Sequence, residues 1–224
     1  MNGSSRAVYE LTRLFFRLVF RCVLDFRVSG TEHVPARGPA ILVANHPCAI
    51  DGFLVIAAVR RRVYGWMRAP NFAPAWRAWY LRALGNRPVG AGEDNRDTMA
   101  WSEDLLRRGG VLLLGPEGDV TIPPPVGPFK GGFLKIALKL GAPVVPVAIV
   151  GSEKILSEPR RPTLLRHHIP HRARVDLKVL PPMWFENPGL DRTLFEAQLG
   201  EVRRGIGAAV DDLLRARAAE KVSL

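Results

Sequence analysis

Short apolar runs alternate with helix-like segments along this 224-residue chain, and this alternation restricts the fold more than any other feature. The runs Pro39 to Ala44, Val111 to Leu114 and Val144 to Val150 are bounded by glycine and proline, as is typical of buried strands. The segments Asn95 to Arg108 and Gly132 to Leu140 show helical periodicity. Because strands that alternate with helices form parallel units, the sequence predicts an α/β fold with a mainly parallel central sheet flanked by helices.

Three further elements complete this prediction. A helix is expected directly after His46, with Pro47 in its first turn. The alternation of Arg174 to Leu180 predicts another strand. Apolar residues at helical spacing predict a C-terminal helix from Leu190 onward, although the glycines at 200, 205 and 207 weaken it.

Residues 6–26 form an amphipathic N-terminal segment. Such a helix suits the membrane interface, but a helix that packs on the protein core with its arginines in solvent fits the same pattern. The exposure of its aromatic residues separates the two interpretations. We predict an amphipathic membrane-interface helix over residues 1–28 and one domain over residues 29–224. The polar residues of the segment recur at intervals of four, three, four and four, which places them on one helical stripe: Arg6, Glu10, Arg13, Arg17 and Arg21.

The charge balance is strongly basic, with a formal net charge of +11, and attracts polyanions such as nucleic acids, anionic lipids and phosphorylated cofactors. No nucleic-acid module is recognisable, so an anionic membrane surface is the expected partner. Two cysteines are too few for a disulfide framework, which favours the cytoplasm. No signal peptide is visible, and the longest apolar run, Phe53 to Val59, is far shorter than the roughly 20 residues of a spanning helix. Peripheral or monotopic association with the inner membrane face is therefore expected.

His46 and Asp51 stand close together after the first predicted buried strand. A direct contact between them requires His46 outside the following helix and Asp51 in its early turns, and Pro47 favours this because it disfavours a helical His46. A carboxylate bonded to one imidazole nitrogen leaves the other nitrogen to take a proton from a hydroxyl. In isolation, a capping histidine beside an unrelated helix N-terminal aspartate is the more common explanation of this spacing.

Glu117 follows the second predicted buried strand, inside the tight loop Gly115-Pro116-Glu117-Gly118. Ligands of open α/β sheets bind beyond the carboxyl ends of the strands, so parallel strands would place His46 and Glu117 on one rim. A plain turn is the alternative.

Other chemistry is poorly supported. Cys48 is interpreted as a small apolar side chain rather than a nucleophile. The histidines at 167, 168 and 171 lack acidic or cysteine partners, so no metal site is expected. The glycines at 90 and 92 do not complete a nucleotide-binding fingerprint, and no cofactor is expected.

Four segments, NHPCAID, GPEGD, GPFKGGFLKIA and APVVPVAI, occur in this order between Gly38 and Ile149. Together they resemble the glycerolipid acyltransferases typified by bacterial lysophosphatidate acyltransferase. The resemblance implies a glycerolipid acyltransferase-like fold and an enzyme that moves a fatty acyl group from acyl-CoA or acyl carrier protein to a lysophospholipid hydroxyl, on 1-acyl-glycerol-3-phosphate or a related lipid, in phospholipid synthesis. It implies His46 as general base, Asp51 as its orienting partner, and substrate-binding roles for Asn45, Pro116, Glu117 and Gly118.

Two departures from the family pattern concern the acceptor phosphate. The family usually continues Pro-Glu-Gly with Thr-Arg, whereas Asp119-Val120 stands here, and the Asp-Arg of its second block has no clear counterpart after Val89. Arg87, Arg96 or Lys130 are the candidate replacements, with Lys130 preferred. The alternatives are an acyltransferase for a non-phosphate or amino-lipid acceptor and a non-catalytic basic membrane-binding protein.

Overall fold

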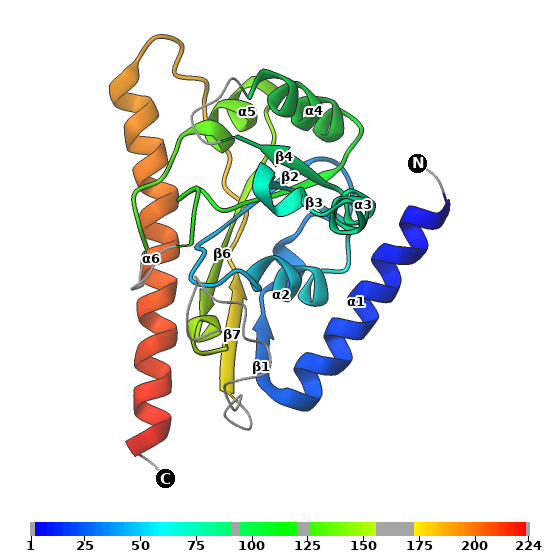
Figure 1. Cartoon of the computed structure of the whole chain (residues 1–224). Helices are drawn as coiled ribbons and strands as arrows, with labels where there is room; N and C mark the ends of the chain where they lie inside the picture. Colours follow the sequence, from blue (N-terminus) through cyan, green and yellow to red (C-terminus); the bar gives the residue numbers. More distant parts are fainter. Residues whose placement is uncertain (1–2, 91–94, 121–125, 156–172, 223–224) are drawn as a thin grey trace.

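The computed structural model describes residues 3–90, 95–120, 126–155 and 173–222. Their strands form a seven-stranded sheet in the order β1-β7-β6-β2-β5-β3-β4 (Figure 1). All neighbouring strands pair in parallel except β6 and β7, which are antiparallel. This arrangement confirms the predicted mainly parallel α/β fold. The strands are β1 (Leu24–Ser29), β2 (Ala40–Ala44), β3 (Val63–Arg68), β4 (Asn86–Val89), β5 (Val111–Leu114), β6 (Val144–Val150) and β7 (Ala173–Val179).

Helices cover both faces of the sheet, so the core has two layers. One layer is filled by side chains from α1, α2 and α3 and the other by side chains from α4, α5 and α6. Figure 1 shows α6 on one side of the sheet and α1 on the other. The helices are α1 (Gly3–Val23), α2 (Asp51–Ala58), α3 (Ala75–Leu84), α4 (Arg96–Arg107), α5 (Gly132–Leu140) and α6 (Arg192–Val222).

Two predicted helix boundaries are wrong. The N-terminal helix ends at Val23, because the next residues pair with β7, where Phe26 lies opposite Val175. The helix after His46 begins at Asp51 rather than at Pro47, because a turn intervenes in which the Asp51 N–H donates to the Cys48 carbonyl at 3.1 Å. Strands β1, β3 and β4 and helix α3 were not predicted.

Helix α1 combines the two interpretations of its sequence. Tyr9 and Phe20 are buried, and the Tyr9 hydroxyl accepts a hydrogen bond from the Val63 N–H at 3.0 Å. Burial of this phenol raises the pKa of Tyr9 to about 12. Its opposite face is open to solvent, with Leu11, Leu14, Phe15 and Leu18 each more than half exposed.

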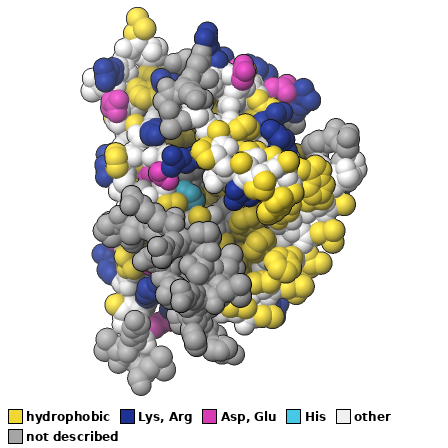
Figure 2. Space-filling view, viewed as in Figure 1, with side chains coloured by type: hydrophobic (Ala, Val, Ile, Leu, Met, Phe, Trp, Pro, Cys, Tyr) yellow, Lys and Arg dark blue, Asp and Glu magenta, His cyan; other side chains and the backbone are white. Residues whose placement is uncertain are grey.

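Helix α3 extends this exposed surface. Thr12 of α1 and Tyr80 of α3 are joined by a 3.0 Å hydrogen bond, and Trp76 and Trp79 of α3 are 69% and 62% exposed. Figure 2 shows hydrophobic side chains gathered over α1 and α3. In the part of the chain that the structure describes, no helix is long and apolar enough to span a bilayer.

Candidate active site

The site begins where the central strand β2 ends. Asn45, the residue after β2, is buried and clamps this end to β6. Its side-chain Nδ2 donates to the Ile149 carbonyl at 2.9 Å, and its Oδ1 accepts from the Ile149 N–H at 2.8 Å. Because both amide atoms are engaged with backbone, Asn45 fixes the position from which His46 projects. The substrate contact that the family resemblance implies for Asn45 stays a prediction.

His46 and Asp51 form the predicted pair. The His46 Nδ1 and Asp51 Oδ2 atoms lie 3.0 Å apart, with the His46 side chain 31% exposed and the Asp51 side chain 3% exposed. The same Asp51 Oδ2 accepts a hydrogen bond from the Cys48 N–H at 2.8 Å, which holds the carboxylate in place. Among the described residues, His46 Nε2 has no hydrogen-bond partner. An imidazole oriented in this way presents Nε2 as the atom that can exchange a proton.

Glu117 lies beside this pair because β5 runs parallel to β2. Its Oε2 accepts from the His46 N–H at 3.3 Å, and its Oε1 accepts from the Gly127 N–H at 2.9 Å. The two residues therefore share one rim, as the positions after β2 and β5 predict. Glu117 joins the His46 turn to the segment that leads into α5, and its direct contact with substrate stays a prediction.

Pro116 and Gly118 shape the loop that carries Glu117. The Pro116 carbonyl accepts from the Lys130 N–H at 2.7 Å, which brings the start of the α5 segment against the loop. Gly118 has a φ of +80°, a left-handed conformation that glycine adopts without steric cost. A Cβ at Gly118 would lie 2.5 Å from Lys130 Nζ, so the Lys130 ammonium covers the glycine. Lys130 is thus placed at this rim.

The other two predicted cations lie in different surroundings. Arg87 stacks on Trp101, with its guanidinium carbon 5.3 Å from the ring centroid. Arg96 is exposed and is the first residue of α4. A substrate-binding role for Arg96 stays a prediction. The histidines at 167, 168 and 171 lie outside the described residues, and within those residues no group of three or more His, Cys, Asp or Glu is arranged to hold a metal ion.

Arg68 is a residue of the site that the sequence did not suggest. It ends β3, which is parallel to β5, and its guanidinium forms a 2.7 Å ion pair with Asp119 Oδ2. An arginine therefore reaches the loop after Pro-Glu-Gly from a neighbouring strand rather than along the chain. The available signal was a basic residue at the end of VYGWM, a segment whose aromatic content suits a strand.

Comparison with known proteins identifies the family of the chain. A family model described as "Acyltransferase" matches residues 25–150, more than half of the chain. An uncharacterized protein of Mycobacterium tuberculosis is 33% identical over 166 residues, which cover 68% of this chain and 43% of that protein. The chloroplastic 1-acyl-sn-glycerol-3-phosphate acyltransferase BAT2 of Brassica napus is 26% identical over 132 residues, 58% of this chain and 38% of that protein. The chain spans about two fifths of the length of these curated relatives.

The fold has a solved counterpart. The crystal structure of the 1-acyl-sn-glycerophosphate acyltransferase PlsC from Thermotoga maritima matches with a TM-score of 0.71 and 23% sequence identity, covering 93% of this chain and 80% of that chain. At this identity the likeness establishes the shared fold. Since the family match runs from β1 to the end of β6 and includes His46, Asp51 and Glu117, the chain belongs to the acyltransferase family.

Proposed function

We propose that this protein transfers a fatty acyl group from acyl-CoA or acyl carrier protein to the hydroxyl of a lysophospholipid, 1-acyl-glycerol-3-phosphate or a related lipid, in phospholipid synthesis. The observation that carries the proposal is the 3.0 Å contact between His46 Nδ1 and the buried Asp51 carboxylate, which leaves Nε2 without a hydrogen-bond partner among the described residues. Such a pair activates a hydroxyl without any protein nucleophile. The names of the relatives in Brassica napus and Thermotoga maritima support a glycerophosphate acceptor.

In the proposed reaction His46 Nε2 takes the proton of the acceptor hydroxyl while the hydroxyl oxygen attacks the thioester carbonyl carbon. The tetrahedral oxyanion then collapses, the C–S bond breaks, and the imidazolium returns the proton to the departing thiolate. Asp51 stabilises the imidazolium between these two steps. The backbone N–H groups at the start of α2 carry the positive end of the helix dipole and are suited to the developing oxyanion.

The exposed face of α1 supports peripheral or monotopic attachment to the inner membrane face. Its apolar side chains, including Leu14 and Phe15, are solvent-exposed, and Arg17 and Arg21 are exposed on the same helix. Aromatic and aliphatic side chains enter the interfacial layer, while arginines bind anionic headgroups. The exposed tryptophans of α3 adjoin this surface through the contact between α1 and α3.

A second acceptor class follows from the pairing of Arg68 with Asp119. An arginine already bound to a carboxylate is less available to an acceptor phosphate, so a neutral or amino-lipid acceptor is the alternative substrate. Lys130 argues for a phosphate, because its ammonium lies at the same loop and has no acidic partner among the described residues. The two acceptor classes therefore differ in whether Lys130 is needed.

One experiment tests the proposal and its alternatives. The purified protein is incubated with labelled acyl-CoA or acyl carrier protein and a panel of phosphorylated, neutral and amino acceptors, and the products are identified by lipid mass spectrometry. The proposal expects transfer to a lysophospholipid by the wild type and none by His46→Ala. Transfer only to neutral or amino lipids would move the function to the second class. No transfer to any acceptor, together with retained vesicle binding, would favour a non-catalytic membrane-binding protein.

A further inference from the structure

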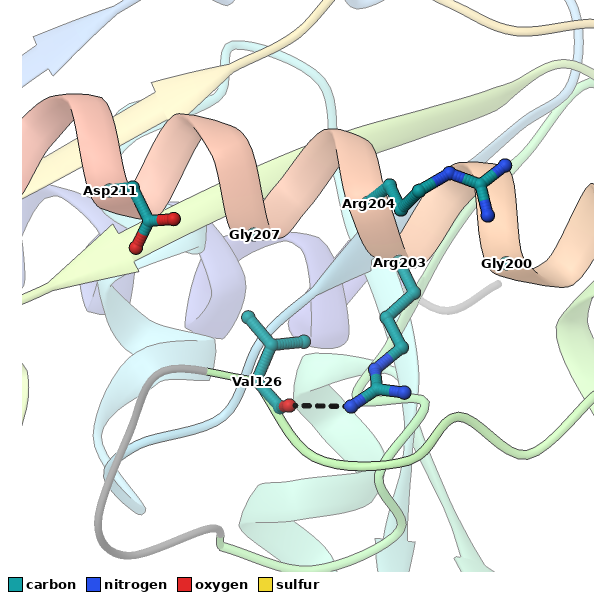
Figure 3. Close-up of a pocket in the computed structure, with 6 residues that line it drawn as sticks. All are labelled: Val126, Gly200, Arg203, Arg204, Gly207 and Asp211. Atoms are coloured by element: carbon teal, nitrogen blue, oxygen red, sulfur yellow. Dashed lines mark hydrogen bonds between the residues drawn. The ribbon is translucent and has the colours of Figure 1, made fainter.

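A recess lies on α6, outside the rim that carries His46 and Glu117. It is open to solvent, has a volume of about 290 Å³ and is lined by one face of the helix and by Val126 (Figure 3). The helix residues recur at three- and four-residue intervals, so they stand on one helical stripe. They are Gly200, Arg203, Arg204, Gly207 and Asp211.

Hydrogen bonds between side chains and backbone connect the recess to His46. Arg203 Nη2 donates to the Val126 carbonyl at 3.3 Å, as Figure 3 shows. The next residue, Gly127, donates its N–H to Glu117 at 2.9 Å, and Glu117 in turn accepts from the His46 N–H. A molecule held in the recess therefore lies against the same loop that borders the catalytic rim.

The glycines of the recess are not required by close packing. A Cβ at Gly207 would meet no atom within 4 Å, and a Cβ at Gly200 would come within 3.0 Å of the Arg204 guanidinium. Glycine is unfavourable inside a helix, and Gly207 leaves room beside α6 that a larger side chain would fill. Gly205 also faces open space but lies outside the recess, which makes it a matched control.

The charged lining selects the ligand chemistry. Two guanidinium groups bind phosphate oxygens well, and Arg204 has no acceptor among the described residues. Asp211 adds a carboxylate to the same recess and accepts hydrogen bonds from hydroxyl or amino groups. A ligand with phosphates beside a ribose and an amino-bearing base satisfies both.

We propose that this recess binds the phosphorylated nucleotide end of an acyl-CoA donor, with Arg204 and Arg203 on its phosphates and Asp211 on its ribose or base. The inference rests on the proposed acyl transfer for the identity of the donor. It assigns coenzyme A rather than a carrier protein as the natural donor. The thioester end would pass the loop at Val126 toward His46.

Calorimetric titration with free coenzyme A tests the recess without relying on activity. Arg204→Ala is expected to raise the Kd about tenfold, the effect of one lost charged contact. Gly207→Ala is expected to raise the Kd as well, because its methyl group enters the recess. Gly205→Ala and Arg215→Ala, which change α6 outside the recess, should bind coenzyme A like the wild type. Arg203→Ala is less informative, because Arg203 also holds the Val126 carbonyl.

Steady-state kinetics complete the test. The KM for acyl-CoA should rise in Arg204→Ala and Gly207→Ala, while the rate with acyl-pantetheine, which lacks the nucleotide, should match the wild type. Unchanged coenzyme A binding in both variants would overturn the inference and leave acyl transfer standing. If coenzyme A binding depends on Arg204 but the protein transfers no acyl group, the recess is confirmed as a coenzyme A site and the proposed function is refuted. An effect of Arg204→Ala confined to acyl carrier protein would also overturn the inference and make the surface a carrier-docking site.

Discussion

Replacing Asp51 by asparagine separates the charge of this residue from its geometry. In the wild type one oxygen, Oδ2, accepts from both His46 Nδ1 and the Cys48 N–H, at 3.0 and 2.8 Å. The Cys48 N–H is always a donor, so the amide of Asp51→Asn will place its oxygen at this position. His46 Nδ1 therefore keeps an acceptor, and the imidazole keeps the tautomer in which Nε2 is the base.

What Asp51→Asn removes is then mainly the electrostatic attraction between the His46 imidazolium and the Asp51 carboxylate. Two unit charges about 4 Å apart attract each other by about 4 kcal/mol at an effective dielectric constant of about 20. Because the His46 side chain is 31% exposed, solvent screens part of this attraction, and about 3 to 4 kcal/mol is the expected effect. With each 1.36 kcal/mol worth a factor of ten in rate, acyl transfer should slow between about 100-fold and 1000-fold.

Initial rates of thiol release from acyl-CoA, with a saturating acceptor, measure this change. Thermal unfolding and circular dichroism of Asp51→Asn serve as the control for an intact fold. Activity within a factor of two of the wild type would refute the role of the Asp51 charge. A loss as complete as that of His46→Ala would instead show that the amide turns its nitrogen toward His46 and that the tautomer argument is wrong.

Four further predictions follow from the same contacts. His46→Ala should abolish transfer while leaving the fold and vesicle binding intact, whereas Cys48→Ala should stay near the wild-type rate; an active His46→Ala would exclude the mechanism. The double variant Leu14→Asp, Phe15→Asp should release the protein from anionic vesicles in flotation assays, and salt should weaken wild-type binding because each arginine near the surface contributes about 1 kcal/mol. Leu214→Asp changes an exposed leucine of α6 and is the matched control. Unchanged flotation of the double variant would contradict membrane binding by α1. Lys130→Ala or Arg96→Ala should raise the KM for a phosphorylated acceptor about tenfold, an effect of about 1.4 kcal/mol, without changing the KM for the donor. Asp119→Asn should lower the KM for the phosphorylated acceptor, because it frees Arg68. Equal use of neutral acceptors by all variants would refute a phosphate site at the loop after Pro-Glu-Gly. Tyr9→Phe should cost about 1 to 3 kcal/mol of unfolding free energy, because the buried Val63 N–H loses its acceptor. The unfolded chain ionises Tyr9 near its ordinary pKa of 10.0, whereas the folded chain ionises it only near 12. The unfolding free energy of the wild type should therefore fall as the pH rises across this window, and that of Tyr9→Phe should fall less. Equal dependence of the two unfolding free energies on pH, measured in denaturant titrations, would contradict this.

The central sheet was predictable because its buried strands leave a strong local signal. Val144–Val150 is buried at every position, and an apolar run of this length between glycine and proline is typical of a strand covered on both faces. The strands that escaped prediction lie toward the edges. β1 and β3 each have only one or two fully buried positions, and β4 carries Pro88, which is tolerated at a sheet edge. Their pairing is decided by tertiary contacts that the local sequence does not encode.

The contact between His46 and Asp51 was predictable because its geometry is local. Pro47 separates His46 from the helix, and the Cys48 N–H locks the carboxylate only a few residues away. Arg68 was not predictable in this way. Its place beside Asp119 depends on the parallel pairing of β3 with β5, and β3 itself leaves a weak pattern. The sequence indicated that an arginine was missing after Pro-Glu-Gly, but only the sheet topology reveals another strand that supplies one.

The two proposed substrate surfaces lie on opposite faces of the sheet, and both are linked to His46. On one face, Phe16 of α1 stacks on Phe53 of α2 with ring centroids 4.4 Å apart, and Phe53 lies two residues after Asp51. On the other face, α6 contacts the loop that binds Glu117. If α1 rests on the bilayer and α6 holds the nucleotide, a lipid acceptor arrives from the apolar side while the charged end of the donor stays in water. The reaction then occurs at the carboxyl edge of the sheet between these two environments, where a base oriented by a buried carboxylate is reachable from both.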